Sequence, residues 1–173
     1  MAQFARPMEA GSMNLVVRPV TGADRDLVVD LLSAAWGTTV MAVHGELYDA
    51  ADQPGFLAVA DGEPAGLLTY RVDGDGAWEI TTLESVRPGL GAGTALLDAV
   101  GAAAAAAGAR RVWLITTNDN VHALRFYQRR GFDLVAIHHD AVTRTRETLK
   151  PSIPLESDGI PIRHELELER PLR

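Results

Sequence analysis

Three alternating glycines make up the segment of the chain with the clearest chemical meaning. Gly89, Gly91 and Gly93 follow a run of strand type and lead directly into an alanine-rich stretch that is typical of a helix. Glycine lets backbone N–H groups turn toward a ligand without a Cβ in the way. A helix start adds unpaired N–H donors and a partial positive charge. This combination predicts a seat for a phosphate or a pyrophosphate.

The loop differs from two common phosphate-binding motifs. A P-loop requires Gly-Lys-Ser/Thr after four intervening residues, and this sequence contains no such run. A dinucleotide-binding fingerprint, Gly-x-Gly-x-x-Gly/Ala, begins at Gly89 and Gly91 but meets Thr94 at its third glycine position. That fingerprint also follows the first strand of its domain, whereas this loop follows several strands. A dinucleotide-dependent oxidoreductase is therefore the weaker alternative.

The composition favours one domain and excludes several classes of protein. The 173 residues are 47% apolar, enough for a core, and the net charge of −7 argues against a general nucleic-acid partner. No apolar run approaches the roughly 20 residues that cross a bilayer, so no membrane partner is expected. The absence of cysteine excludes disulfides and thiolate metal sites, and it fits a cytoplasmic protein. Residues 1–13 are expected to form a flexible leader, and residues 14–173 the domain.

The spacing of apolar residues predicts an α/β (α+β) domain with a mixed sheet. Strands are expected at 15–20, 56–60, 65–72, 78–86, 111–117, 132–138 and 162–168. One helix carries Leu27, Val28, Leu31 and Leu32, and two more are expected at 94–107 and 122–130. Turn signals between the middle strands predict an antiparallel meander, and the glycine loop opens a parallel strand–helix–strand crossover. Residues 36–52 are ambiguous, and 139–162 are expected to be a polar connection.

Two segments resemble the signature motifs of the GNAT superfamily of N-acetyltransferases. The family's cofactor motif, Gln/Arg-x-x-Gly-x-Gly/Ala, follows its fourth strand, and Gly91-Ala92-Gly93 supplies the glycine end, with Pro88 in place of Gln or Arg. Residues 120–132 are similar to the family's Asn-x-x-Ala-x-x-Phe-Tyr-x-x-x-Gly-Phe segment at every defining position. The resemblance covers about residues 15–172. It implies the small single-domain bacterial type, with a mostly antiparallel central sheet, splayed fourth and fifth strands, and flanking helices.

The resemblance implies that acetyl-CoA, a co-substrate, lies in the gap between the splayed strands. Carried over by position, the pyrophosphate is held by the backbone N–H groups of Gly89, Leu90, Gly91, Ala92, Gly93 and Thr94. The edge formed by Glu84, Ser85 and Val86 pairs with the pantetheine arm as an added strand would. Asn120 reaches the arm from the other side, while Ala123 and Phe126 line the channel.

The resemblance also assigns candidate catalytic residues. Tyr127 is the candidate general acid for the leaving sulfur, because a phenol with a pKa of about 10 is protonated at neutral pH. Its alternative role is that of a packing aromatic. Glu84 is the candidate base for the amine, with an exposed strand glutamate as the alternative and Glu79 as a second candidate base. A backbone N–H near Leu83 or Glu84 would polarise the thioester carbonyl.

For other charged and aromatic residues the sequence supports weaker predictions. Candidates for binding the cofactor's 3′-phosphate are Arg87, Arg125 and Arg129. Candidates for lining the acceptor pocket are Trp36, His44, Tyr48 and Trp78, with ordinary packing as the alternative for at least two of them. No metal site is predicted at His138 and His139, because neighbouring strand residues point to opposite faces. Residues 144–163 are expected either to shape the acceptor side, to form a homodimer contact, or to be a solvated loop.

The sequence therefore predicts an acetyl-CoA-dependent N-acetyltransferase that acts on an amine of a small molecule or a peptide. The amine is expected to attack the thioester directly in a ternary complex. The alternative is a non-catalytic acyl-CoA-binding sensor or subunit, and the presence of Glu84, Asn120 and Tyr127 favours the enzyme. No residue pattern identifies the acceptor, although the acidic net charge slightly favours a cationic or neutral amine.

Overall fold

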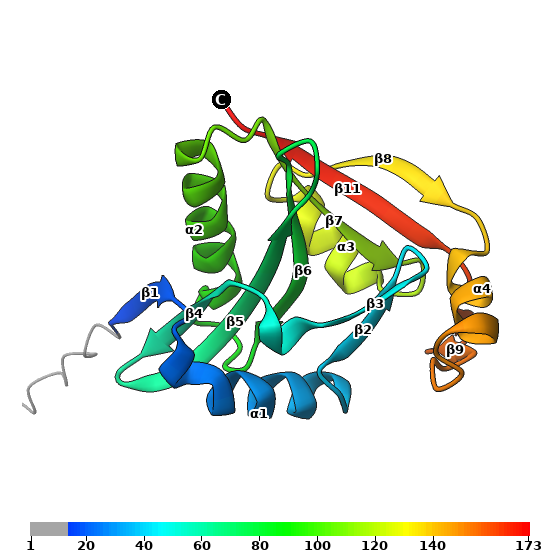
Figure 1. Cartoon of the computed structure of the whole chain (residues 1–173), viewed down its shortest axis with the longest axis horizontal. Coiled ribbons are helices and arrows are strands. Elements are labelled where there is room, and N and C mark those ends of the chain that lie inside the picture. Colours follow the sequence, from blue (N-terminus) through cyan, green and yellow to red (C-terminus); the bar gives the residue numbers. More distant parts are fainter. Residues whose placement is uncertain (1–13) are drawn as a thin grey trace, which may run out of the picture.

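A seven-stranded sheet runs through the part of the chain that the structure describes, residues 14–173 of a computed structural model (Figure 1). The expected leader, residues 1–13, lies outside these described residues. The helices are α1 (Arg25–Trp36), α2 (Ala92–Ala106), α3 (Val121–Gln128) and α4 (Ala141–Thr148), with 3-10 turns at Gly22–Asp24 and Ala50–Asp52. The strands of the main sheet are β1 (Leu15–Pro19), β4 (Gly55–Ala60), β5 (Glu63–Val72), β6 (Trp78–Ser85), β7 (Arg111–Thr117), β8 (Asp133–His138) and β11 (Glu165–Pro171).

The order of the strands confirms the predicted mixed sheet. The order is β1-β4-β5-β6-β7-β11-β8, and every neighbouring pair is antiparallel except β6 and β7. Parallel pairing between β6 and β7 covers only Trp78–Ile80 of β6, whereas β6 continues to Ser85 and β7 to Thr117. The two strands therefore separate beyond Ile80, which leaves the later edge of β6 without a strand partner on that side. This is the predicted splay.

Helices cover both faces of the sheet. Neighbouring strand residues point to opposite faces, so each strand contributes apolar side chains to both. On one face, Ala58 and Leu68 join a core that contains Leu96 and Leu97 of α2. On the other face, Leu57 and Leu67 pack with Leu32 of α1. Figure 1 shows α2 beside the long strands β5 and β6, and α1 along the bottom of the view.

A β-bulge at Thr81 interrupts β6 and changes which side chains share a face. The register against β5 steps from Ile80 to Thr82, so Thr81 is an extra residue in β6. Without the bulge, Glu79 and Glu84 would face opposite sides of the sheet, because they are an odd number of residues apart. With it, both carboxylates lie on the face that α1 covers. Thr69 on β5 contacts both Thr81 and Thr82 through its hydroxyl, at 2.8 and 2.7 Å.

Two segments without a predicted structure contain regular elements. The ambiguous region forms a hairpin of β2 (Val40–Val43) and β3 (Glu46–Asp49), whose turn places both His44 and Gly45 at positive φ. The expected polar connection contains α4 and a small hairpin of β9 (Glu156–Ser157) and β10 (Ile160–Pro161). The prediction of a plain connection was therefore wrong. The helix was hard to recognise because it buries only Val142 and Thr145, which gives a weak apolar pattern.

Within residues 14–173, no helix combines the length and the apolar character that crossing a membrane requires.

Candidate functional site

A cavity of about 680 Å³ opens where β6 and β7 separate; it is called the strand-gap cavity below. Its walls come from β6, the glycine loop, the start of α2, β7, α3 and the end of α1. The cavity thus reaches both the face covered by α2 and α3 and the face covered by α1. A ligand placed here would lie against elements from both halves of the chain.

The glycine loop forms one wall of the strand-gap cavity. Gly89 and Gly91 have φ values of 82° and 75°, in the left-handed region that side chains rarely adopt, and nothing lies within 4 Å of a Cβ built at either position. Gly91 precedes α2 directly, and its carbonyl accepts the N–H of Ala95 at 3.0 Å. The N–H groups at the start of α2 precede this bond and have no intrahelical acceptor. The wall therefore offers several backbone donors and the positive end of a helix.

Gly93 allows α2 and α3 to approach closely. A Cβ at Gly93 would lie 3.0 Å from Cζ of Phe126 on α3. The guanidinium of Arg130 stacks 3.6 Å from the centre of the Phe126 ring, and its Nε–H donates to the hydroxyl of Thr94 at 2.8 Å. These contacts hold a cation beside the first turn of α2.

Arg130 is the one arginine of residues 14–173 that lines the cavity, and it was not among the predicted residues. Arg125 and Arg129 are exposed and lie outside the cavity wall, and Arg87 donates to the carbonyl of Ala60 at 3.1 Å. The sequence signal was a group of arginines in and directly after one predicted helix. Which of them faces the cavity depends on where α3 ends, at Gln128, and the sequence places helix ends poorly.

Most of the predicted cofactor contacts lie on the wall of the cavity, and two do not. Those on the wall are Ser85, Gly89, Gly91, Ala92, Gly93, Thr94, Asn120, Ala123 and Phe126. Val86 and Leu90 lie outside it, and the N–H of Val86 donates to the carbonyl of Ala65 at 3.0 Å. Asn120 caps α3 by accepting the N–H of Ala123 at 3.1 Å, which leaves its amide N–H groups for another partner. His122, which carried no prediction, also lines the cavity.

Tyr127 is a buried phenol on the wall of the strand-gap cavity. Its ring packs edge-on against Phe126 and Phe132, at 5.3 and 5.5 Å between ring centres. Burial raises the pKa of Tyr127 above its ordinary value, and the nearby charge of Glu84 raises that pKa further. The phenol is consequently protonated across the neutral range and can act as a proton donor.

Glu84 lies on the same cavity wall, on the face of the sheet that α1 covers. Burial raises the pKa of the Glu84 carboxyl, and the indole of Trp36 partly opposes that shift. A carboxylate with a raised pKa is a better proton acceptor than an ordinary glutamate. Trp36, at the end of α1, also lines the cavity and is half exposed.

The other candidate base and acceptor-side residues lie elsewhere. Glu79 is buried, is paired with Arg71, and does not line the strand-gap cavity. Trp78 stacks on Tyr70 at 4.3 Å in the core, and the Tyr48 ring lies 5.1 Å from the Arg71 guanidinium. His44 lines a second, smaller cavity.

A family model, two related sequences and a solved structure all match most of the described chain. The family model described as "Acetyltransferase (GNAT) family" matches residues 25–132. The uncharacterized protein YdhI of Bacillus subtilis (strain 168) is 39% identical over 154 residues, which cover 88% of this chain and 95% of YdhI. The uncharacterized protein YxbD of the same strain is 39% identical over 163 residues, which cover 93% of this chain and 100% of YxbD. The structure of a Bacillus subtilis acetyltransferase in complex with CoA matches with a TM-score of 0.65 and 22% identity, covering 94% of this chain and 100% of that one, and shares the fold.

Proposed function

Because the chain belongs to the GNAT family of acetyltransferases and has the small single-domain bacterial form, we propose that it transfers an acetyl group from acetyl-CoA to an amine. The acceptor we propose is a small molecule or the N-terminus of a peptide. The observation that carries the proposal is the strand-gap cavity, which joins the glycine loop and the start of α2 to the buried phenol of Tyr127 and the carboxyl of Glu84.

The glycine loop and α2 support the use of acetyl-CoA as the co-substrate. Backbone N–H groups at residues 89–94 and the positive end of α2 suit a diphosphate. Arg130, which donates a hydrogen bond to the hydroxyl of Thr94, adds a positive charge beside this binding site. The edge of β6 at Ser85 has no parallel neighbour beyond Ile80, so its backbone is available to pair with the amides of a pantetheine arm. The similar Bacillus subtilis acetyltransferase was solved with CoA.

The residues on the face of the sheet that α1 covers support the binding of the acceptor amine on that side of the thioester. Glu84 and Trp36 meet at this end of the cavity, and a carboxylate beside an aromatic ring favours a cationic or polar amine. The amine must be neutral to attack. Glu84 accepts its proton, directly or through a water molecule, because a raised carboxyl pKa brings the base closer to neutral pH.

The proposed reaction is a direct transfer in a ternary complex. The amine nitrogen forms a bond to the thioester carbon, and a backbone N–H near Leu83 or Glu84 stabilises the developing oxyanion. The carbon–sulfur bond then breaks, and Tyr127 donates its phenolic proton to the leaving sulfur. Holding both reactants in line contributes roughly 7–11 kcal/mol toward lowering the barrier.

The test is the release of free CoA thiol from acetyl-CoA across a panel of primary amines, with a titration of CoA alone in parallel. The proposal expects CoA to bind and at least one amine to release thiol in proportion to acetylated product. Tight CoA binding without release by any amine would instead support a non-catalytic acyl-CoA-binding protein. Failure to bind CoA at all would contradict both interpretations.

A further inference from the structure

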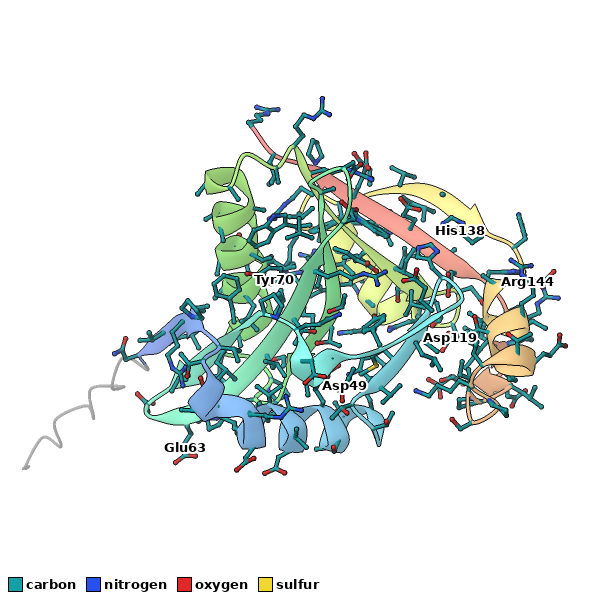
Figure 2. The ribbon with its side chains drawn as sticks, viewed as in Figure 1. Asp49, Glu63, Tyr70, Asp119, His138 and Arg144 are labelled. Carbon is teal, nitrogen blue, oxygen red and sulfur yellow. The ribbon has the colours of Figure 1, made fainter. Side chains whose placement is uncertain are left out.

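A second cavity, of about 220 Å³, lies away from the strand-gap cavity, between the β2–β3 turn, the ends of β8 and β11, and α4; it is called the hairpin cavity below. His44, His138, Arg144 and Glu165 are among the residues on its wall. Figure 2 labels His138 on β8 and Arg144 on α4, and Figure 1 shows the tip of the β2–β3 hairpin reaching toward this end of the sheet.

Three side chains with metal-binding groups meet beside this cavity. One ring nitrogen each of His44 and His138 and a carboxylate oxygen of Glu167 all lie within 4.8 Å of one another. Nε2 of His138 is 2.9 Å from Oε2 of Glu167, and the two imidazole rings are 4.9 Å apart, edge to face. Three elements that are distant in the sequence supply the groups: the β2–β3 turn, β8 and β11.

Beside this cluster, Glu165 has a carboxylate oxygen without a hydrogen-bond partner among residues 14–173. Its side chain is 3% exposed and lines the hairpin cavity, yet Oε2 is buried and makes no hydrogen bond within the described residues. A buried carboxylate oxygen without a hydrogen-bond partner destabilises the folded state. Nδ1 of His44 lies 3.5 Å from this oxygen. The other oxygen, Oε1, accepts the backbone N–H of His44 at 3.2 Å.

We propose that His44, His138 and Glu167 bind a divalent transition-metal ion of the Zn²⁺ class, with Glu165 orienting His44. Two imidazoles and one carboxylate are a common three-ligand set for zinc, with a water molecule in the fourth position. When His44 binds through Nε2, its Nδ1–H is left to donate to Oε2 of Glu165. This outer carboxylate fixes the tautomer and the orientation of the ring, as in many zinc sites.

The spacing of the groups suits this assignment. Bonds of about 2.0–2.1 Å in a tetrahedral zinc site place ligand atoms roughly 3.3 Å apart. The separations at this cluster, from 2.9 Å to within 4.8 Å, bracket that value, so modest side-chain rotations complete the geometry. Arg111 lies 3.8 Å from the other oxygen of Glu167, Oε1, and leaves Oε2 facing His138.

The site differs from a pairing of His138 with His139, for which the sequence predicts no metal site because neighbouring strand residues point to opposite faces. His139 instead packs against His164, with their ring centres 5.2 Å apart. The second histidine ligand is His44, held at φ 52° in the turn of the β2–β3 hairpin, where Asn, Asp or Gly is the usual choice. A bound ion would fasten this hairpin to β8 and β11.

The test is a calorimetric titration of tag-free protein with ZnCl₂, comparing wild type with His138→Ala and with its neighbour His139→Ala. We expect one ion per chain with a Kd below about 10 µM, and a rise in Tm of several degrees at saturating zinc. His138→Ala and Glu167→Gln should weaken binding at least tenfold. His139→Ala should bind like wild type, and Glu165→Gln should weaken binding about 10- to 100-fold.

Two further controls keep the test decisive. His44→Asn removes a ligand but tolerates the left-handed backbone, so it should lose zinc while its zinc-free Tm stays near that of wild type. Each variant is checked for its zinc-free Tm, so that misfolding is not mistaken for loss of a ligand. The proposal is overturned if wild type does not bind zinc with a Kd below about 10 µM, or if His139→Ala weakens binding as much as His138→Ala.

Discussion

The Nε–H of Arg130 donates to the hydroxyl of Thr94 at 2.8 Å, so the cation that follows α3 is held against the first turn of α2. The same guanidinium donates from Nη1 to the carbonyl of Phe126 at 2.9 Å and stacks on the Phe126 ring. Thr94 belongs to the predicted phosphate seat, whereas Arg130 does not follow from either motif. The hydrogen bond therefore places Arg130, which no motif predicted, beside Thr94, where the diphosphate of the cofactor is expected.

Replacing Arg130 should weaken the binding of CoA more than it slows the reaction. In Arg130→Gln, a charge-assisted contact to phosphate is lost, which is worth about 1.5–3 kcal/mol, or roughly 10- to 100-fold in Kd. Calorimetric titration with CoA measures this directly. The matched control is Arg129→Gln, because Arg129 is exposed and lies outside the cavity wall. Equal losses in the two variants would mean that only general surface charge matters.

Removing the phenolic hydroxyl of Tyr127 should slow turnover while leaving cofactor binding nearly unchanged. Tyr127→Phe keeps the ring contacts with Phe126 and Phe132 but loses the proton donor, so kcat should fall about 100-fold or more. The rate of thiol release at saturating substrates gives kcat, and a CoA titration gives the affinity. An unchanged kcat would remove Tyr127 from the mechanism and leave it a packing residue.

The pH dependence of kcat/KM should report Glu84 on its acidic side. Burial raises the pKa of Glu84, so the active carboxylate form should be lost at a pH above the titration range of an ordinary glutamate. As pH rises through that pKa, kcat/KM should increase, and Glu84→Gln should be slower and lack this rise. Glu79→Gln is the control, because Glu79 is paired with Arg71 and does not line the strand-gap cavity. A rise that survives in Glu84→Gln would assign the base elsewhere.

Asp24 should make the folded state sensitive to acid. Its carboxylate accepts hydrogen bonds from Nη1 and Nη2 of Arg18, at 2.8 and 2.7 Å. It also accepts hydrogen bonds from the backbone N–H and the hydroxyl of Thr21, each at 2.8 Å. The Arg18 hydrogen bonds are the main reason that the pKa of Asp24 lies well below its usual range, and those from Thr21 add to this. The stability contributed by the charged form is therefore present above pH of about 4 and is lost as pH falls below it.

Unfolding midpoints from pH 3 to pH 7 test this expectation. Asp24→Asn should be less stable than wild type at neutral pH, and the difference should shrink toward pH 3. Asp26→Asn, in the first turn of α1, is the control, because Asp26 is exposed. A difference between Asp24→Asn and wild type that is constant with pH would show that the charge of Asp24 is not the cause.

Much of the fold follows from patterns that the sequence carries locally. The strand at 111–117 is continuous and apolar because it is buried in the middle of the sheet, and its predicted limits match β7. The loop between Gly89 and Gly93 combines positive φ angles with a helix start, so a site for an anion could be predicted there from the residue types alone. The antiparallel meander followed by one parallel crossover is likewise confirmed.

What could not be predicted depends on contacts between distant segments. The bulge at Thr81, which puts Glu79 and Glu84 on one face, has no local signal because it is defined by the register against β5. The position of β11 between β7 and β8 is equally a matter of long-range pairing. His44 meets His138 and Glu167 only because the β2–β3 hairpin folds across the end of the sheet, and the hairpin segment was ambiguous in sequence.

The measurement that tests the central claim most directly is the affinity for CoA of Gly91→Val compared with Gly108→Val. Both glycines lie at ends of α2 with left-handed φ values, 75° and 82°, and neither has an atom within 4 Å of a built Cβ. The two substitutions therefore impose similar backbone strain on one helix, of about 1–3 kcal/mol. We predict that Gly91→Val weakens CoA binding at least tenfold while Gly108→Val binds as wild type does. Unchanged affinity in Gly91→Val, or an equal loss in both variants, would contradict the assignment of the glycine loop as the diphosphate seat.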